Sequence, residues 1–244
     1  MRISIITIVF NGKDEIEKTI QSVINQSFND CEYIIIDGES SDGTLDVIKK
    51  HSSKISKIVS EKDNGIYDAM NKGISYANGE WLCFMNAGDT FADDFVLERI
   101  FNMQIDGDTK FIYSDFILQK TSGEECVIRT NKHKGLILHQ ASIYRKSLHL
   151  SFGLYVVTDS IIISDYMFFS SIPEKYFKKV DVIIARFLDG GVSAAKWCYY
   201  HRLCLDVIYK KRKMKELFML VIYRELIGLI PVNFRRKIKK LLKI

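Results

Sequence analysis

The 244-residue sequence is poor in proline, with only two, and it contains no proline-rich or glycine/serine-rich linker. Its five cysteines are scattered and include no Cys-x-x-Cys pair. This argues against a disulfide framework or a zinc site and is typical of reduced thiols in the cytosol. No small-residue cleavage site follows the apolar N-terminal segment, so we expect no signal peptide.

The sequence also lacks the glycine-rich loops that hold phosphates in common nucleotide-binding folds. The first strand-like run, residues 3–10, leads into Asn11-Gly12-Lys13-Asp14 instead of Gly-x-Gly-x-x-Gly, and no P-loop occurs. A phosphate-bearing ligand would therefore need another source of positive charge. A divalent cation held by carboxylate is the usual one, so we expect Mg²⁺ or Mn²⁺ as the cofactor.

Charge is divided unevenly along the chain. Residues 201–244 carry 13 Lys/Arg and 3 Asp/Glu, a balance of +10, which against the total of +5 leaves −5 for residues 1–200. An acidic body with a basic tail is not the pattern of a nucleic-acid-binding domain, so no nucleic-acid partner is expected. The tail is instead suited to an anionic surface.

Apolar periodicity predicts an α/β domain followed by helices. Strand-like runs at 3–10 and 33–37 flank an amphipathic helix at 14–27, which predicts a right-handed βαβ unit. Up to residue 103 we further expect a helix capped by Ser41-Asp42-Gly43, strands near 58–59 and 80–86, and helices at 67–77 and 93–103. After that we expect strands at 111–118, 125–130 and 136–145, a helix at 159–171 and an extended segment at 178–188. Helices are expected from about 194 to the end. We expect a domain at 1–192, with a nucleotide-binding half (1–90) and an acceptor half (91–192), and a basic amphipathic helical tail at 193–244.

Polar motifs follow two of the predicted strands and fill the loop between them. They are Asp37-Gly38-Glu39-Ser40-Ser41-Asp42-Gly43, the stretch Glu61–Gly73, and Asn86-Ala87-Gly88-Asp89. Ligands of open α/β sheets bind outside the carboxyl ends of the strands, where such carboxylates can contact a nucleotide or a cation. Each motif taken alone is also consistent with ordinary turn and helix-cap chemistry.

In this order the motifs resemble glycosyltransferase family 2, of the GT-A fold, over roughly residues 1–190. Thr7-Ile8-Val9-Phe10-Asn11 ends the first strand, and His139-Gln140, Ser164-Asp165-Tyr166 and Gly190-Gly191-Val192-Ser193 resemble acceptor-side marks of the bacterial surface-polysaccharide, colanic-acid-type subgroup. The resemblance implies an α/β fold with a central, mostly parallel sheet flanked by helices. It also implies transfer of a sugar from a nucleoside diphosphate, with UDP favoured, to an acceptor hydroxyl with inversion.

The resemblance also implies roles for individual residues. Asp89 would be the metal ligand, and Asp165 would be the catalytic base, with a pKa raised by its apolar surroundings. The acceptor side would include His139, Gln140 and Tyr166, although His139 is equally consistent with a partly buried structural histidine. The donor contacts would be Thr7, Val9, Phe10, Asn11, Asp37, Ser40, Asp42, Asp68, Asn71, Lys72 and Asn86.

Two departures from the family pattern leave alternatives open. The metal turn has the single acidic residue Asp89, and Met70 stands where many relatives have arginine. A non-catalytic scaffold that binds nucleotide sugars therefore remains an alternative. A sugar-1-phosphate nucleotidyltransferase is a second one, but it would need a basic glycine-rich loop after the first strand. Processive relatives carry a Gln-x-x-Arg-Trp motif and transmembrane helices. This sequence has neither that motif nor an apolar run long enough to span a membrane, which favours non-processive transfer.

The tail predicts a peripheral position on the cytoplasmic face of the membrane. Arg224-Glu225 interrupts the apolar stretch at 217–234, which argues against a spanning helix. After Pro231, basic residues alternate with apolar ones at helical spacing, as in interfacial helices. Polyprenyl-diphosphate-linked glycans would place the acceptor at the same surface. The alternative is that the tail packs on the domain or on a second copy in a homo-oligomer.

Overall fold

The computed structural model describes residues 1–120, 122–132, 136–158, 163–189 and 196–228. The chain forms two compact units, Met1–Ala194 and Ala195–Ile244. None of the helices in the described part of the chain has the length and apolar character needed to cross a membrane.

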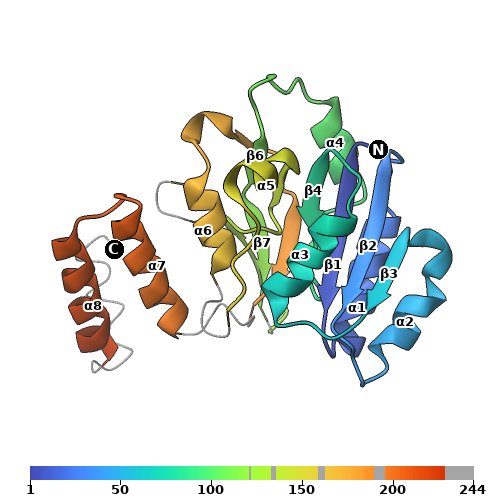
Figure 1. Ribbon diagram of the computed structural model, residues 1–244, viewed down its shortest axis with the longest axis horizontal. Coiled ribbons are helices and arrows are strands. Elements are labelled where there is room, and N and C mark those ends of the chain that lie inside the picture. Colours follow the sequence, from blue (N-terminus) through green and yellow to red (C-terminus); the bar gives the residue numbers. More distant parts are fainter. Residues whose placement is uncertain (121, 133–135, 159–162, 190–195, 229–244) are drawn as a thin grey trace. The chain divides into compact units, whose positions relative to one another are not determined.

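The first unit is built on a seven-stranded sheet in the order β10-β6-β9-β4-β1-β2-β3. Its strands β1, β2, β3, β4 and β6 are labelled in Figure 1. The central strand β1 pairs in parallel with β2 and β4, whereas β9 is antiparallel to both β4 and β6. The strands are β1 (Ile3–Val9), β2 (Cys31–Asp37), β3 (Lys57–Ser60), β4 (Trp81–Phe84), β6 (Phe111–Ser114), β9 (Ser142–Arg145) and β10 (Phe177–Val180).

Alternating residues of the central strands form two apolar cores, one on each face of the sheet. Ile5 and Ile35 belong to one core, and Ile6 and Ile36 belong to the other. The first core is completed by α1 (Lys13–Ile24), α2 (Thr44–Lys50) and α4 (Val96–Asn102); the second is completed by α3 (Ile66–Tyr76), α5 (Ser147–Phe152) and α6 (Ser164–Ser171). The continuous β-branched runs of β1 and β2 are explained by this burial on both faces.

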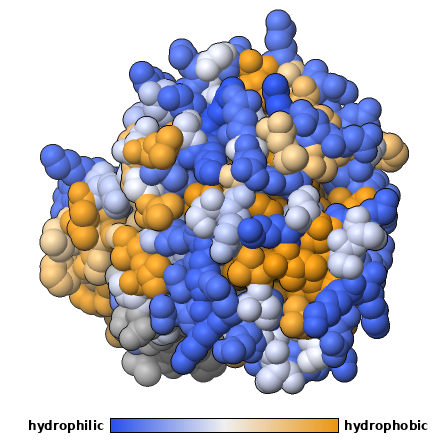
Figure 2. Space-filling model, turned by 45° about the vertical axis from the view of Figure 1, so that its right-hand side comes forward, coloured by the Kyte–Doolittle hydropathy of each residue, from blue (hydrophilic) through white to orange (hydrophobic). Residues whose placement is uncertain are grey.

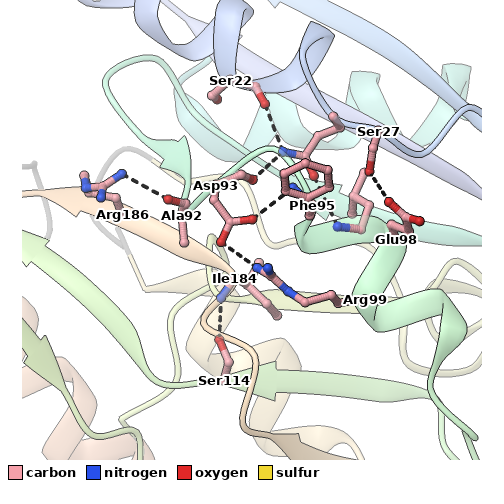
Figure 3. A network of polar contacts seen from close by, with 12 residues as sticks. Ser22, Ser27, Ala92, Asp93, Phe95, Glu98, Arg99, Ser114, Ile184 and Arg186 are labelled. Atoms are coloured by element: carbon pink, nitrogen blue, oxygen red, sulfur yellow. Dashed lines mark hydrogen bonds and ion pairs between the residues drawn. The ribbon is translucent and has the colours of Figure 1, made fainter.

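The first unit also contains a four-stranded sheet in the order β5-β11-β7-β8. Its strands are β5 (Thr90–Phe91), β7 (Phe116–Gln119), β8 (Glu125–Ile128) and β11 (Ala185–Leu188). Figure 3 shows the polar contacts near β5: Arg99 pairs with Asp93 at 2.5 Å, and Arg186 donates to the carbonyl of Ala92 at 3.4 Å. The second contact joins the segment after Asp89 to β11, and the first joins the same segment to α4.

The predicted βαβ unit and the mixture of short strands and helices after residue 90 are confirmed, but two boundaries are corrected. The segment expected as a strand at 136–145 is a strand only at Ser142–Arg145, so His139 and Gln140 lie in irregular backbone. The helix expected at 93–103 begins at Val96. The predicted cap of α2 is confirmed: its N-cap residue is Gly43, in the left-handed conformation, and the Asp42 carboxylate accepts the N–H of Thr44 at 3.0 Å. Residues 159–162 of another expected helix lie outside the described residues.

The second unit contains α7 (Lys196–Ile208) and α8 (Met214–Gly228). These two helices confirm the prediction of successive helices from about residue 194. Asp206 accepts a 2.8 Å hydrogen bond from the guanidinium of Arg212, which fixes the turn between the helices. The basic segment at 229–244 lies outside the described residues.

On the face of the molecule in Figure 2, hydrophilic residues predominate and hydrophobic residues gather in a few separate areas.

Candidate functional site

The loops that follow β1 and β2 are bound to each other. The Asn11 N–H donates to Ser40 Oγ at 2.8 Å, the Ser41 N–H donates to Asn11 Oδ1 at 3.0 Å, and the Lys13 N–H donates to Asp42 Oδ2 at 3.1 Å. Asn11 has a φ of 48°, a left-handed conformation that asparagine tolerates better than most residues. The predicted residues Asn11, Ser40 and Asp42 are therefore neighbours at the carboxyl edge of the sheet.

Asp37, the last residue of β2, has one unused oxygen at this edge. Its side chain is fully buried, and Oδ2 accepts hydrogen bonds from Ser60 Oγ at 2.6 Å and the Ser40 N–H at 3.2 Å. Its Oδ1 has no hydrogen-bond partner among the described residues. Because a buried oxygen without a partner is costly, a donor from a ligand would stabilise this site.

An exposed aromatic ring lies close to Gly38, the residue that follows Asp37. Phe10 is 65% exposed, which is unusual for a phenylalanine in a folded domain. A Cβ placed on Gly38 would lie 3.3 Å from the Phe10 ring and 2.5 Å from Asp63 Oδ2. Glycine at 38 therefore keeps the space between Phe10 and Asp63 free of a side chain.

Thr7 and Val9 do not contribute side chains to the candidate site, which corrects the prediction for these two residues. Thr7 is fully buried, and its Oγ1 donates to the carbonyl of Met85 at 2.7 Å and shares a hydrogen bond with Tyr33 Oη. Val9 is 3% exposed and belongs to an apolar core. The reason is the two-residue period of a strand, which directs both side chains into the same core.

The loop at 61–65 is bound to the first two turns of α3. Lys72 Nζ lies 2.9 Å from Glu61 Oε1 and donates to the carbonyl of Lys62 at 2.7 Å. Asp68 Oδ2 accepts from the Asn64 N–H at 2.9 Å. Partial burial lowers the pKa of Lys72, but the neighbouring carboxylate of Glu61 outweighs this and raises it overall, so the ammonium stays charged.

Asn71 has a structural role that the sequence did not predict. Its amide nitrogen donates to the carbonyl of Tyr155 at 2.9 Å, and its amide oxygen accepts from the Tyr155 N–H at 3.0 Å. This pair of hydrogen bonds fastens α3 to the segment after α5. We therefore leave Asn71 out of the candidate donor site.

Asp89 is buried in a tight turn. It is 5% exposed, and the preceding Gly88 has a φ of 95°, which favours glycine. Asp89 Oδ2 accepts from Gln140 Nε2 at 2.9 Å, and Oδ1 accepts from the Leu188 N–H at 3.4 Å. Burial raises the pKa of Asp89 to about 6. Thr19 of α1, which the sequence analysis missed, donates to the Asp89 carbonyl at 2.8 Å.

Asp165, the first-turn acid of α6, is held by donors from two other parts of the chain. Its Oδ2 lies 3.0 Å from His139 Nδ1, and its Oδ1 accepts from the Tyr67 hydroxyl at 2.8 Å. Burial raises the pKa of this carboxyl, but the hydrogen bonds from His139 and Tyr67 outweigh it, and the pKa lies below its ordinary value. The predicted increase in the pKa of Asp165 is therefore wrong.

His139 connects Asp165 to the turn that contains Asp89. Its Nε2 lies 2.9 Å from the amide nitrogen of Asn86, which is a donor. A neutral ring that accepts there carries its hydrogen on Nδ1 and donates it to Asp165. Since Gln140 contacts Asp89, two adjacent residues link the predicted metal ligand to the predicted base. Tyr166 is 8% exposed, so its ring is mostly buried instead of lining an acceptor site.

The residues around Asp89 fit a cation held by one protein carboxylate. No group of three or more His, Cys, Asp or Glu side chains with metal-ligand geometry occurs among the described residues. However, two buried amide oxygens in that same part of the chain, Asn86 Oδ1 and Gln140 Oε1, lack hydrogen-bond partners, and both residues flank Asp89. A buried carboxylate with a raised pKa beside unused oxygens is chemically suited to a hard divalent cation.

Comparisons with known proteins agree with this geometry. Residues 4–162 match the family described as Glycosyl transferase family 2. The chain is 29% identical over 202 residues to a PGL/p-HBAD biosynthesis glycosyltransferase of Mycobacterium bovis, with 78% of each chain covered.

Two solved structures have the same fold. Staphylococcus aureus TarS 1–349 in complex with UDP superposes with a TM-score of 0.69 at 16% identity, covering 86% of this chain and 65% of that one. The mannosyltransferase PcManGT of Pyrobaculum calidifontis, in complex with GDP-Man and Mn²⁺, gives a TM-score of 0.62 at 15% identity, covering 82% and 60%. This chain thus spans less than two thirds of either structure. The fold is GT-A, and the chain is an enzyme that belongs to glycosyltransferase family 2.

Proposed function

We propose that this enzyme transfers a sugar from a uridine diphosphate donor to an acceptor hydroxyl in one displacement that inverts the anomeric carbon. The observation that carries the proposal is the link between Asp89 and Asp165 through the adjacent residues Gln140 and His139. One carboxylate near the diphosphate and one near the acceptor are the groups that a direct displacement needs.

The donor end of the site is assigned from Asp37 and Phe10. The unused Oδ1 of Asp37 would accept a hydrogen bond from the N3–H of uracil, and the exposed Phe10 ring offers an apolar surface for the base. TarS, which shares the fold, has been solved with UDP and with UDP-GlcNAc. Asn11, Ser40 and Asp42 surround this position, and Asp68 and Lys72 would face the diphosphate and sugar.

The metal would be Mg²⁺ or Mn²⁺ with Asp89 as its protein carboxylate. When bound, such an ion would neutralise charge on the diphosphate as it leaves. The buried setting of Asp89 supports this role, because a cation would offset the cost of keeping its carboxylate charged. PcManGT, a protein of the same fold, binds Mn²⁺ together with GDP-Man.

Asp165 would take the proton of the acceptor hydroxyl. As that oxygen forms its bond to the anomeric carbon, the bond from the carbon to the diphosphate breaks, and the proton passes to Asp165. The lowered pKa of Asp165 supports this role because the carboxyl is ionised at neutral pH. His139 would hold the carboxylate through its Nδ1–H. A single base with no protein nucleophile accounts for inversion.

The acceptor is proposed to be a glycan or a polyprenyl-diphosphate-linked glycan of bacterial surface-polysaccharide assembly, extended by one sugar per encounter. The enzyme would work at the cytoplasmic face of the membrane, held there by the basic tail. The charge of +10 over residues 201–244 supports this location. An oligomer of identical chains is compatible with the proposal.

A panel of nucleotide sugars tests the proposal. UDP-glucose, UDP-galactose, UDP-N-acetylglucosamine and GDP-mannose would each be incubated with Mn²⁺ or Mg²⁺, and release of the diphosphate would be measured with water as the acceptor. We expect release from a UDP-sugar and none in excess EDTA. Release from GDP-mannose alone would overturn the donor assignment, and full activity in EDTA would overturn the metal assignment.

A further inference from the structure

Tyr67 joins the first turn of α3 to Asp165, from which it is separated by 98 residues. Its hydroxyl donates to Asp165 Oδ1 at 2.8 Å. The ring is 7% exposed and packs against Tyr155 with a centroid distance of 5.5 Å. Burial, together with the charge of Asp165, raises the pKa of Tyr67 far above its ordinary value, so the hydroxyl keeps its proton and remains a donor.

The same part of α3 carries the residues on the donor side. Asp68, the next residue, accepts from the Asn64 N–H, and Lys72, one turn later, donates to the Lys62 carbonyl. The helix therefore holds the loop before it through two side chains and contacts Asp165 through a third. A displacement of this turn would move both the loop and the hydroxyl of Tyr67.

Close packing fixes the position of α3 on the sheet. A Cβ on Gly73 would lie 2.5 Å from Ile6 Cγ2, so the helix lies against β1 without room for a side chain. The two hydrogen bonds between Asn71 and the backbone of Tyr155 hold the other side. The Tyr67 hydroxyl is thus presented to Asp165 by a rigid element.

The contacts of Asp165 distinguish its two oxygens. Oδ1 accepts both the Tyr67 hydroxyl and the Tyr166 N–H, each at 2.8 Å. Among the described residues, Oδ2 accepts only from His139. Since each carboxylate oxygen has about two lone-pair directions, Oδ1 is saturated and Oδ2 has one lone pair left. That lone pair is the position from which Asp165 can accept a further proton.

We propose that Tyr67 is a positioning residue that orients Asp165 so that Oδ2 faces the acceptor hydroxyl, and that it ties this orientation to the donor-side turn of α3. The inference rests on the proposed role of Asp165 as the base. Without the hydroxyl, Oδ1 would regain a free lone pair, and the carboxylate would be held less firmly, by His139 on Oδ2 and the Tyr166 N–H on Oδ1. The proton would then be accepted from more than one orientation, most of them unproductive.

Tyr67→Phe tests the proposal because it removes one oxygen and keeps the ring. We expect kcat for release of UDP from the UDP-sugar used by the wild type to fall by about 10- to 100-fold, the range for one hydrogen bond to a charged group. The calorimetric affinity for UDP with Mn²⁺ should be unchanged. Tyr76→Phe is the matched control, since Tyr76 lies on the same helix and its ring contacts Lys57 at the surface.

Two further readouts separate positioning from a general structural effect. Among the described residues, the titratable groups that interact with Asp165 include His139, Tyr67, Tyr144 and Tyr155, and the loss of one donor raises the pKa of the carboxyl. The acid limb of the kcat profile should therefore move to higher pH in Tyr67→Phe. In an Asp165→Asn background, Tyr67→Phe should cause little additional loss, because residues that act as a unit are not additive.

The outcomes distinguish the inference from the function on which it rests. Wild-type kcat and pH profile in Tyr67→Phe, together with an inactive Asp165→Asn, would overturn the role of Tyr67 alone. Additive losses in the double variant would also overturn it, because Tyr67 would then act independently of Asp165. Wild-type turnover in Asp165→Asn, or no UDP release by the wild type from any sugar nucleotide, would instead overturn the proposed function.

Discussion

His139 Nδ1 lies 3.0 Å from Asp165 Oδ2, and the following residue, Gln140, donates to Asp89 at 2.9 Å. His139 and Gln140 lie in irregular backbone, yet their side chains contact two carboxylates that lie 76 positions apart in the sequence. This arrangement places the two chemical roles of the proposed reaction within one connected network. The following predictions test its members separately.

Asp89→Asn should abolish turnover and weaken the binding of Mn²⁺ by the enzyme. The change keeps the shape of the side chain but removes the charge that would hold Mn²⁺. Electron paramagnetic resonance of Mn²⁺, recorded with UDP in the presence and absence of the protein, measures how much Mn²⁺ the protein binds. Asp94→Asn, a change at an exposed carboxylate five residues later, is the control. Wild-type binding of Mn²⁺ by Asp89→Asn would contradict the assignment.

Asp165→Asn should keep the affinity for UDP and lose about 10²- to 10⁴-fold in turnover, the contribution of a well-placed general base. The base acts on the acceptor and need not touch the nucleotide. Calorimetry measures the first quantity and UDP release the second, with the exposed Asp181→Asn as the control. Retention of more than about a tenth of the activity would assign Asp165 a different role.

Asp37→Asn should weaken the binding of UDP by about 10- to 100-fold, because a hydrogen bond to a charged acceptor is lost. CDP should bind the wild type weakly, since cytosine has an acceptor at N3, and the substitution should reduce the difference between the two nucleotides. Calorimetry with UDP and CDP provides both values. Asp46→Asn on the exposed face of α2 is the control. An unchanged preference for UDP would rule out contact between Asp37 and the base.

His149 should make the folded state sensitive to acid. Burial between Tyr144 and Phe168 lowers its pKa from 6.5 to about 4, so between these values the unfolded chain binds a proton that the folded chain does not. The free energy of unfolding therefore does not depend on this group above pH 6.5. As the pH falls from 6.5 towards 4, the free energy of unfolding decreases by about 1.4 kcal/mol per pH unit because of His149. Urea unfolding of the wild type and of His149→Phe at several pH values measures this. Parallel pH dependences of the two proteins would show that His149 does not contribute.

The tail should bind anionic membranes. Replacing Arg235, Arg236, Lys239, Lys240 and Lys243 with glutamine removes five charges, each worth about 1 kcal/mol at such a surface. Full-length protein should float with anionic vesicles at low salt, and the variant should not. Glutamine at the five exposed lysines Lys18, Lys49, Lys50, Lys54 and Lys57 is the matched control. Equal flotation of both variants would show that the tail is not the anchor.

The sequence alone determined the features that depend on local pattern. The β-branched runs at Ile3–Val9 and Cys31–Asp37 predicted strands buried on both faces, and the polar motifs after them predicted an edge where a ligand binds. The order of these motifs was sufficient to indicate the family, because each motif is made of residues that lie only a few positions apart and can be read directly from the sequence. The prediction of Asp37 as a ligand contact needed the same information and remains to be tested.

Tertiary structure decided which side chains meet. The strand period buried Thr7 and Val9, and packing of α3 assigned Asn71 to the backbone of Tyr155. Tyr67 was overlooked because its partner is 98 residues away, and the pKa of Asp165 was predicted in the wrong direction because the apolar neighbours in sequence do not reveal donors from distant segments. Hydrogen bonds act over about 3 Å in space, and sequence distance does not measure that separation.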